Sequence, residues 1–438
     1  MQQDADAASW PAPAADGPVR ARLTLPGSKS ITNRALILAA LADAPTLVTG
    51  PLRSRDTRLM SGALRALGAD IADGADGWAV TPGPMDHGAR VDVGNAGTVM
   101  RFIPPVAALA DGEVSLHGDP RASQRPVGPL ISALRSLGAD IDDGGRGTIP
   151  FNVRGAGRMD GGGVTLDASS SSQLVSGLLL AGCRYDKGLE VRHQGPPVPS
   201  APHIAMTVGM LRAAGAEVEQ SDQAGAGGRP DAWRVYPGTL RPGTIAVEPD
   251  LSNSAPFLAA AVVTGGSVTI AGWPSHTVQP GDHILGLLTR MGATCGHGPD
   301  GLTVTGTGTI RGITADLRDC NELTCVLAAV AAVASSPSVF TGIAHMRTHE
   351  TDRLAALATE IGKLGGQVTE LPDGLEIRPR PLAATGALFD SYDDHRMVMA
   401  GAVLGLAVPG VRVANVATVA KTFPDFTALW GQLMGRSS

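Results

Sequence analysis

The sequence predicts an α/β protein of two domains, each built from three copies of a βαβαββ-like unit. Two kinds of helix alternate along the 438 residues: one is amphipathic and ends at a glycine, and the other is apolar with a polar first turn. Short β-rich runs, such as 267–270 and 411–413, lie between them. A regular repeat indicates that one supersecondary unit is used many times. Because six such units are too large to share a single hydrophobic core, we expect two domains of three units.

The amphipathic helices end in a recurring Leu-Gly-Ala turn, exact or nearly so, that leads into a strand. Its glycines return at a nearly constant spacing along the chain. Each fits the left-handed position that closes a helix, where glycine has no steric penalty. The five glycines are Gly68, Gly138, Gly215, Gly292 and Gly365.

The apolar helices are hydrophobic nearly all round, as in 258–263 and 326–332, which is typical of helices inside a domain. We expect them to begin near Asn33, Asn95, Ser171, Ser252, Asn321 and Asp394. The last unit is expected to end in a helix over 427–434. Pro and Gly punctuate 237–243, so a domain boundary is expected between 240 and 250.

The bulk composition argues against several classes of protein. A net charge of −6 and a pI of about 5.9 disfavour nucleic-acid binding. The sequence has no apolar stretch long enough to cross a membrane and no secretory signal pattern, so we expect a cytoplasmic protein. The four cysteines lack metal-ligand spacing and are expected to be reduced core thiols. Residues 1–19, rich in Ala, Pro and Asp, are expected to form a mobile tail.

Cationic residues gather where the apolar helices begin. Residues 25–34 read Leu-Pro-Gly-Ser-Lys-Ser-Ile-Thr-Asn-Arg, which places Lys29 and Arg34 on the first turns of a helix. Free backbone N–H groups and the positive end of the helix dipole already favour an anion there. Since cations are usually unfavourable at this end of a helix, we interpret the segment as an anion site. The spacing of a Walker loop is absent.

Further motifs of the same kind follow along the chain. They are 94–98 with Arg101, 121–126, 169–173, 349–353, and 393–396 with Lys421. Each is unspecific by itself, but together with the first segment they place seven cations at comparable positions in an acidic protein: Lys29, Arg34, Arg101, Arg125, Arg353, Arg396 and Lys421. This arrangement predicts small ligands that carry several negative charges. No His-Glu-x-x-His motif or comparable ligand set occurs, so neither a metal nor another cofactor is expected.

These motifs, in this order, resemble those of the 5-enolpyruvylshikimate-3-phosphate synthases of the enolpyruvyl transferase family, from about residue 23 to 430. The resemblance implies two domains of three βαβαββ units, related by pseudo-threefold symmetry and joined by a two-stranded hinge. One domain would be 27–247, on the shikimate 3-phosphate side. The other would combine 20–26 with 248–438, on the phosphoenolpyruvate side.

The resemblance also implies a reaction. The enolpyruvyl group of phosphoenolpyruvate would move to the 5-hydroxyl of shikimate 3-phosphate by addition and elimination, with release of phosphate. This is a step of the shikimate pathway to aromatic amino acids. The expected partners are these two small molecules alone, and a monomer is expected.

Roles for individual residues are implied in the same way. Lys29, Glu322 and Glu350 would be catalytic, with Glu350 handling the proton at the methylene carbon. Shikimate 3-phosphate would be bound by Lys29, Ser30, Arg34, Ser171, Ser172, Gln173, Ser200, Glu322 and His349. Phosphoenolpyruvate would be bound by Lys29, Asn95, Gly97, Arg125, Gln173, Arg353, Arg396 and Lys421.

The sequence departs from the family pattern at three positions. The family's usual Asp, which acts on the 5-hydroxyl, lies at a set spacing before a common Lys; here that spacing leads back to Glu322, with Asp319 as the alternative. His349 takes the place of that Lys. Phe102 stands where Pro is common, which leaves the degree of glyphosate sensitivity open although Gly97 fits the sensitive pattern.

Three other classes of function are less favoured. The sister transferase that acts on UDP-N-acetylglucosamine typically carries a reactive Cys in the loop corresponding to 118–126, which here has none. A non-catalytic anion-binding protein of the same fold would not need two carboxylates beside its anions. An RNA 3′-end-processing relative is disfavoured by the acidic pI and the scarcity of aromatic residues.

Overall fold

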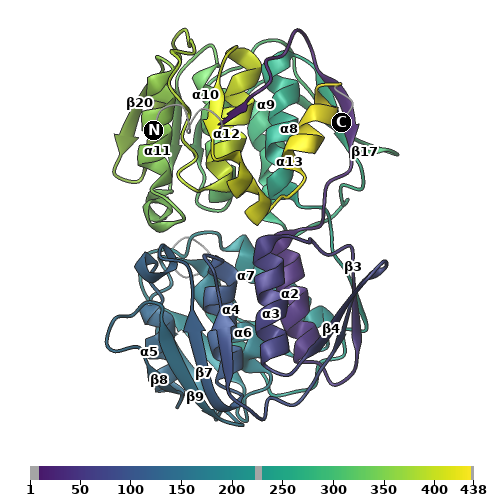
Figure 1. The fold of residues 1–438 in the computed structure, drawn as a ribbon, viewed down its shortest axis with the longest axis vertical. Coiled ribbons are helices and arrows are strands. Elements are labelled where there is room, and N and C mark those ends of the chain that lie inside the picture. The colour runs from purple at the N-terminus through teal and green to yellow at the C-terminus, as the bar shows by residue number, and fades with distance from the viewer. Residues whose placement is uncertain (1–8, 222–228, 436–438) are drawn as a thin grey trace. The chain divides into compact units, whose positions relative to one another are not determined.

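A computed structural model describes residues 9–221 and 229–435, and it divides the chain into two compact units. One unit is Gly27–Val247, and the other combines the chain up to Pro26 with the chain from Glu248 onward. The chain therefore passes between the units twice, at Pro26–Gly27 and at Val247–Glu248. Figure 1 shows that each unit is a group of helices bordered by small sheets.

Three four-stranded sheets surround the helices of the unit Gly27–Val247. Their strand orders are β14-β3-β5-β4, β6-β7-β9-β8 and β10-β11-β13-β12. In each, the first two strands are parallel and the other pairs are antiparallel. The strands are β3 (Thr46–Thr49), β4 (Asp70–Gly74), β5 (Gly77–Thr81), β6 (Ala89–Asp92), β7 (Asp111–His117), β8 (Asp140–Asp142), β9 (Phe151–Ala156), β10 (Gly162–Leu166), β11 (Leu189–His193), β12 (Val218–Gln220), β13 (Ala232–Val235) and β14 (Thr244–Ala246).

The other unit shows this pattern twice completely and once in part. Two of its sheets have the orders β16-β17-β15-β2 and β18-β19-β21-β20, in which β2 with β15 and β18 with β19 are the parallel pairs. The third pairs only β1 with β22, and Phe389 forms a parallel bridge to Val413 of β22. The strands are β1 (Ser9–Pro11), β2 (Arg20–Leu23), β15 (Ser267–Ile270), β16 (Thr294–Gly298), β17 (Gly301–Thr305), β18 (Thr314–Asp316), β19 (Ser338–Thr341), β20 (Gln367–Leu371), β21 (Gly374–Arg378) and β22 (Arg412–Ala414).

Two of the repeats take their parallel edge strand from a distant part of the sequence. β14, at the end of the unit Gly27–Val247, pairs with β3 near its beginning. β2 pairs in the same parallel way with β15, although the whole of the unit Gly27–Val247 separates them in sequence. The expectation of an α/β fold made of repeated βαβαββ units is thus confirmed. The strands β14 and β2, which lie next to the two places where the chain passes between the units, complete two of the sheets.

The expected mobile tail over 1–19 is wrong for residues 9–19, whereas residues 1–8 lie outside the described part. β1 pairs antiparallel with β22, and the Arg412 guanidinium donates to Ser9 Oγ at 2.7 Å. The indole of Trp10 meets the ring of Phe426 edge-on, with centroids 6.3 Å apart. Composition did not reveal this strand because its partner strand lies near the opposite end of the sequence.

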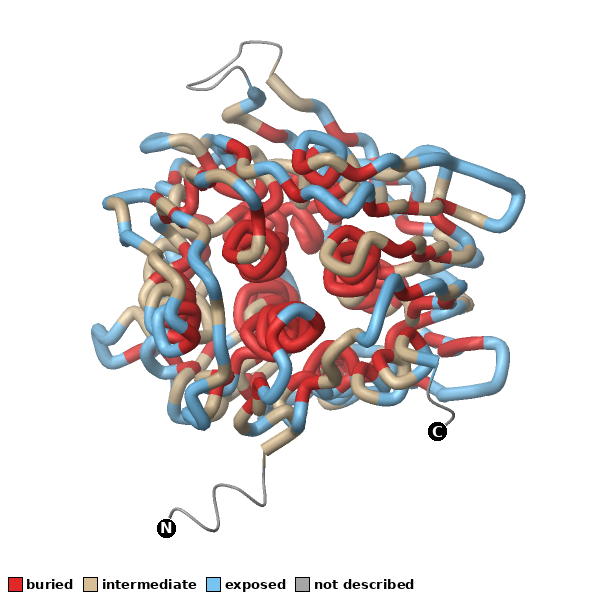
Figure 2. The backbone as a smooth tube through the Cα atoms, turned by 90° about the horizontal axis from the view of Figure 1, so that it is seen from above, coloured by how far each residue is buried: buried red, intermediate tan, exposed pale blue. Residues whose placement is uncertain are grey.

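Six helices are buried in the interiors of the two units. They are α2 (Lys29–Ala40), α4 (Gly97–Ala107), α6 (Ser172–Gly182), α8 (Leu251–Thr264), α10 (Thr324–Ala332) and α12 (His395–Ala407). In Figure 2 largely buried (red) coils lie inside surrounding segments along which buried and exposed residues alternate. α2 begins at Lys29, earlier than the expected start near Asn33, because the Ser28 side chain caps it by accepting from the Ile31 N–H.

The helices of a second set each bury one face, and five of the six end at a recurring glycine. The set is α3 (Arg55–Ala66), α5 (Gly128–Ser136), α7 (Pro202–Ala213), α9 (His283–Arg290), α11 (Arg353–Lys363) and α13 (Phe426–Leu433). The five repeat glycines have φ between 91° and 110°, so their expected positive φ is confirmed. None of the helices in the described part of the chain is both long and apolar enough to cross a membrane.

We predict that Trp10→Ala lowers the free energy of unfolding by about 2 kcal/mol, because it removes an aromatic contact that ties β1 to α13. Urea unfolding would measure the change. Val278→Ala is the control, since Val278 is 50% exposed, and it should leave stability nearly unchanged. Equal stability of Trp10→Ala and the wild type would contradict a structural role for this strand.

Candidate functional site

In the unit Gly27–Val247 the first turns of α2, α4 and α6 meet. Asn33 of α2 donates to Thr98 Oγ1 of α4 at 2.6 Å. The Arg101 guanidinium of α4 donates to Gln173 Oε1 of α6 at 3.4 Å. Because each helix start carries a partial positive charge, this convergence attracts an anion.

The caps of these three helices leave that charge uncompensated. Ser28 caps α2, and Ser171 caps α6 by accepting from the Gln173 N–H at 3.2 Å. Ala96 precedes α4 and provides no side-chain cap. None of these capping residues is acidic. A bound anion at this end of the helices therefore meets no competing carboxylate from the caps.

Arg34 is a buried cation whose neighbours are neutral. Its guanidinium donates to Thr207 Oγ1 at 2.7 Å and to the carbonyls of Ser30 at 3.0 Å and His203 at 3.1 Å. Burial lowers the pKa of Arg34 to about 9, so it still carries its charge at neutral pH. Within the described residues no carboxylate forms an ion pair with Arg34. A buried charge of this kind favours a bound anion.

A second polar group surrounds Gly97 at the start of α4. The Arg125 guanidinium donates to the carbonyl and the side-chain oxygen of Asn95 at 2.8 and 2.9 Å. A Cβ built on Gly97 would lie 2.8 Å from Arg125 Nη2, 3.0 Å from Gln173 Oε1 and 3.3 Å from Arg101 Nη1. Glycine at this position therefore allows three polar side chains to approach the helix start closely.

Arg101 belongs to this group although we assigned it no substrate contact from the sequence. It is buried, and its Nε has no hydrogen-bond partner among the described residues. Burial, and then the charge of Arg125, lower the pKa of Arg101 to about 9. The sequence motif contained this arginine, but only the fold shows that it faces Gly97 and Gln173.

The remaining expected residues of this unit lie at helix starts too. Lys29 begins α2, and its Nζ is 3.3 Å from Oδ2 of Asp56, a buried carboxylate on α3 that the sequence did not single out. Ser172 is the first residue of α6. Ser200 is buried just before α7, with φ of 53°.

The first turns of three buried helices also meet in the other unit. The Ser252 hydroxyl of α8 donates to Glu322 Oε1 at 3.1 Å, and Glu322 lies in η3 (Asn321–Leu323), directly before α10. The Arg396 guanidinium of α12 donates to the Ser252 carbonyl at 3.0 Å. Burial raises the pKa of Glu322, while its own backbone N–H, Arg396 and Ser252 act in the opposite direction.

Two of the three buried helices of this unit have acidic caps, unlike the buried helices of the first unit. Asp250 caps α8, and its Oδ1 accepts from the Asn253 N–H at 2.9 Å. Asp394 caps α12 in the same way, accepting from the Arg396 N–H at 2.8 Å. It also binds Arg353 through both oxygens, at 2.8 and 3.1 Å. The positive helix ends here are thus partly balanced within the chain.

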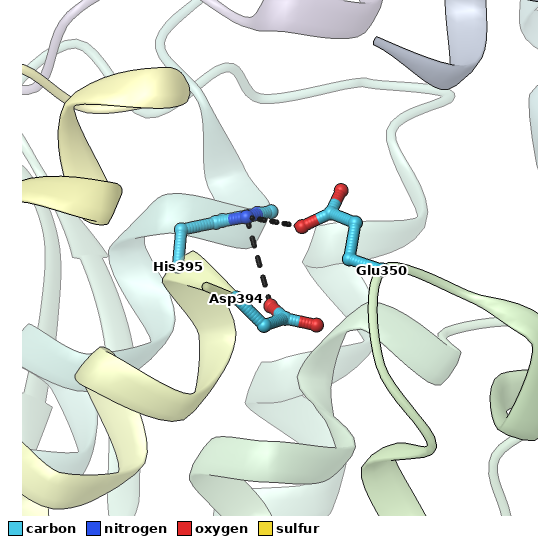
Figure 3. A group of neighbouring side chains, drawn as sticks. All are labelled: Glu350, Asp394 and His395. Carbon is cyan, nitrogen blue, oxygen red and sulfur yellow. Dashed lines mark hydrogen bonds and ion pairs between the residues drawn. The ribbon is translucent and has the colours of Figure 1, made fainter. Parts of the chain in front are cut away.

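Glu350 lies among cations and an imidazole, as Figure 3 shows in part. Its Oε2 is 3.0 Å from Nδ1 of His395, and its Oε1 is 3.0 Å from Nζ of Lys421. Burial alone would raise the pKa of Glu350, but Lys421, His395 and Arg353 together hold it well below its ordinary value. Glu350 is therefore ionised at neutral pH.

Glu350, Asp394 and His395 are close enough together for one metal ion to contact all three. Both carboxylates, however, already pair with cations: Asp394 with Arg353, and Glu350 with Lys421. These charges would repel a metal ion at the same place. The cluster suits proton transfer beside an anion better than metal binding.

His349 is held against the same arginine. Nη1 of Arg353 lies 3.3 Å from Nδ1 of His349, and since a guanidinium only donates, Nδ1 accepts. The imidazole is neutral in this arrangement, unlike the lysine common in the family. The ring of His345 meets that of His349 edge-on at 5.4 Å, and burial, with the charge of Arg353 next, lowers the pKa of His345 to about 4.

Repeated α/β units with cations at converging helix starts define a protein suited to small ligands with several negative charges. A family model described as "EPSP synthase (3-phosphoshikimate 1-carboxyvinyltransferase)" matches residues 13–430. The chain therefore belongs to the EPSP synthase family, and the resemblance inferred from its motifs is confirmed.

Individual relatives agree with this assignment. The 3-phosphoshikimate 1-carboxyvinyltransferase of Kocuria rhizophila is 50% identical, over 97% of this chain and 96% of that protein. Two structures of EPSP synthase from Acinetobacter baumannii match with TM-scores of 0.78 and 0.77. They are 27% and 26% identical to this chain, and each match covers 97% of both chains.

We predict that Lys421→Met lowers the free energy of unfolding by about 2 kcal/mol at pH 7, because it leaves buried Glu350 with one cation fewer. The lowered pKa of Glu350 adds stability that is present above the ordinary glutamate pKa of about 4.3 and is lost as the pH falls through the folded value. The difference between the variant and the wild type should therefore shrink at acidic pH.

Urea unfolding at several pH values between about 2 and 7 measures this effect. Lys187→Met is the matched control, since Lys187 forms an exposed ion pair with Asp160. It should change stability little at any pH. A loss in Lys421→Met that stays constant across the whole range would contradict the coupling to Glu350.

Proposed function

We propose that this chain transfers the enolpyruvyl group of phosphoenolpyruvate to the 5-hydroxyl of shikimate 3-phosphate, with release of phosphate. The observation that carries the proposal is its 50% identity, over nearly the whole length, to a 3-phosphoshikimate 1-carboxyvinyltransferase. The buried arginines at the helix starts support it, because both substrates carry several negative charges. The reaction belongs to the synthesis of aromatic amino acids.

Shikimate 3-phosphate would rest mainly on the unit Gly27–Val247. Its phosphate would lie at the start of α6, held by Ser171, Ser172 and Ser200, where neutral caps leave the helix dipole free to act. Its carboxylate would be held by Ser30 and Arg34. The other contacts proposed for it are Lys29, Gln173, Glu322 and His349.

The residues proposed to hold phosphoenolpyruvate are mainly cations. Its phosphate and carboxylate would be bound by arginines and lysines that lie at helix starts and around Glu350. The proposed contacts are Lys29, Asn95, Gly97, Arg125, Gln173, Arg353, Arg396 and Lys421. Two polyanions side by side repel each other, so such a concentration of cations has a clear physical purpose.

The reaction would proceed in two balanced steps. Glu322 would take the proton of the 5-hydroxyl while that oxygen bonds to C2 of phosphoenolpyruvate and C3 gains a proton. The tetrahedral intermediate would then lose a proton from C3 and its phosphate, which restores the C2–C3 double bond. Glu350, protonated once the bound anion offsets the charges of Lys421 and Arg353, would give the proton to C3 in the first step and take it back in the second. The proton on Glu322 would pass to the departing phosphate, which Lys29 would stabilise. The opposite pKa shifts of Glu322 and Glu350 support separate roles for the two carboxylates.

The deciding measurement is phosphate release by the purified protein. We expect release when shikimate 3-phosphate and phosphoenolpyruvate are both present, and none with either alone. Glu322→Gln should retain binding of both ligands but lose most of the turnover. Release with UDP-N-acetylglucosamine in place of shikimate 3-phosphate would show that the proposed substrate is wrong.

Gly97→Ala should raise the KM for phosphoenolpyruvate by about tenfold, because the added methyl group displaces Arg125 and Gln173. The KM for shikimate 3-phosphate should change less. Gly62→Ala is the matched control: a Cβ there meets nothing within 4 Å. If both variants show wild-type KM values, Gly97 is not beside the phosphoenolpyruvate site.

A further inference from the structure

Ser252 contacts two residues to which the proposed function gives different tasks. Its hydroxyl donates to Glu322, the proposed base, at 3.1 Å. Its backbone carbonyl accepts from Arg396, a proposed ligand of phosphoenolpyruvate, at 3.0 Å. Three separate segments, α8, η3 and α12, are thus joined through one residue. Sequence reasoning marked Ser252 only as the start of a helix.

The helix start that carries Ser252 is held firmly from several sides. Asp250 caps α8, and Gln279 Oε1 accepts from the Leu251 N–H at 3.3 Å. Gly281 packs so closely against this turn that a Cβ on it would collide with the Ser252 nitrogen. Ser252 therefore sits on a rigid element, which is what a group that orients others requires.

We propose that Ser252 is a positioning residue, which holds the Glu322 carboxylate and the Arg396 guanidinium in a fixed relation to each other. The inference rests on the proposed function, because that function makes Glu322 the base and Arg396 a ligand of phosphoenolpyruvate. The hydroxyl donates to the carboxylate that must accept the substrate proton. The backbone carbonyl of Ser252 accepts from the Arg396 guanidinium on the neighbouring helix α12.

The charged surroundings of Glu322 make its hydroxyl partner important. Arg396 faces it from α12 and favours its ionised form, while Asp250 from the start of α8 opposes ionisation. Cys320 lies on the same segment, where burial and then Glu322 raise the pKa of its thiol, so that thiol is uncharged. Removing the Ser252 hydroxyl takes one donor away from a buried carboxylate, which then keeps its proton to higher pH.

The experiment compares Ser252→Ala with Ser254→Ala on the same helix. Ser254 is buried, and its hydroxyl donates to the Leu251 carbonyl of its own turn. We expect kcat/KM of Ser252→Ala at pH 7 to fall about tenfold and the acid limb of its pH profile to move to higher pH. Ser254→Ala should retain the wild-type profile, and Ser252→Thr, which keeps a hydroxyl, should recover most of the activity.

The outcomes separate this inference from the proposed function. If the wild type releases phosphate and Glu322→Gln does not, but Ser252→Ala shows the wild-type pH profile, then Ser252 is not a positioning residue. A fall in activity that leaves the acid limb in place would likewise overturn the inference, because a purely structural defect has that result. If Glu322→Gln keeps wild-type turnover, the base assignment fails first, and the inference falls with it.

Discussion

The convergence of three helix starts in each unit is the constraint on which the site depends. Each start adds partial positive charge from free N–H groups, and the neighbouring starts reinforce it. In the unit Gly27–Val247 serine and alanine occupy the caps, and Arg34 and Arg101 lack acidic partners within the described residues. In the other unit Asp250 and Asp394 compensate part of the charge. The first arrangement favours an external anion, and the second holds charged side chains in fixed positions.

Charge compensation also explains how two buried carboxylates differ. Glu350 lies 3.0 Å from both Lys421 and His395, and these two groups together with Arg353 outweigh the effect of burial and keep it ionised. For Glu322 burial is the larger effect, and its pKa is raised. The same kind of side chain therefore has opposite pKa shifts at two places, and the packing of the helix starts makes the difference.

The repeat is completed by segments far away in the sequence. β14 and β2 supply edge strands to repeats whose other elements lie elsewhere along the chain, and β1 supplies a strand to the last repeat. β1 pairs with β22, and η5 (Val416–Lys421) follows β22 closely and ends at Lys421. β1, which the composition predicted to be part of a mobile tail, thus pairs with the strand that is followed by the segment carrying Lys421.

Patterns along the chain were enough to predict the repeat, the two kinds of helix, the glycines that end one kind, and the motifs of the family. These features follow from local periodicity, backbone conformation and the order of motifs, which need no knowledge of packing. The three-dimensional arrangement was needed to show that β1 is a strand and that Arg101 faces Gly97. It also revealed that Asp56 pairs with Lys29, that His349 accepts from Arg353, and that Ser252 joins Glu322 to Arg396. Apart from the His349–Arg353 and Arg101–Gly97 contacts, each within one motif, these contacts link separate elements of the chain, so their burial and partners depend on how those elements pack together.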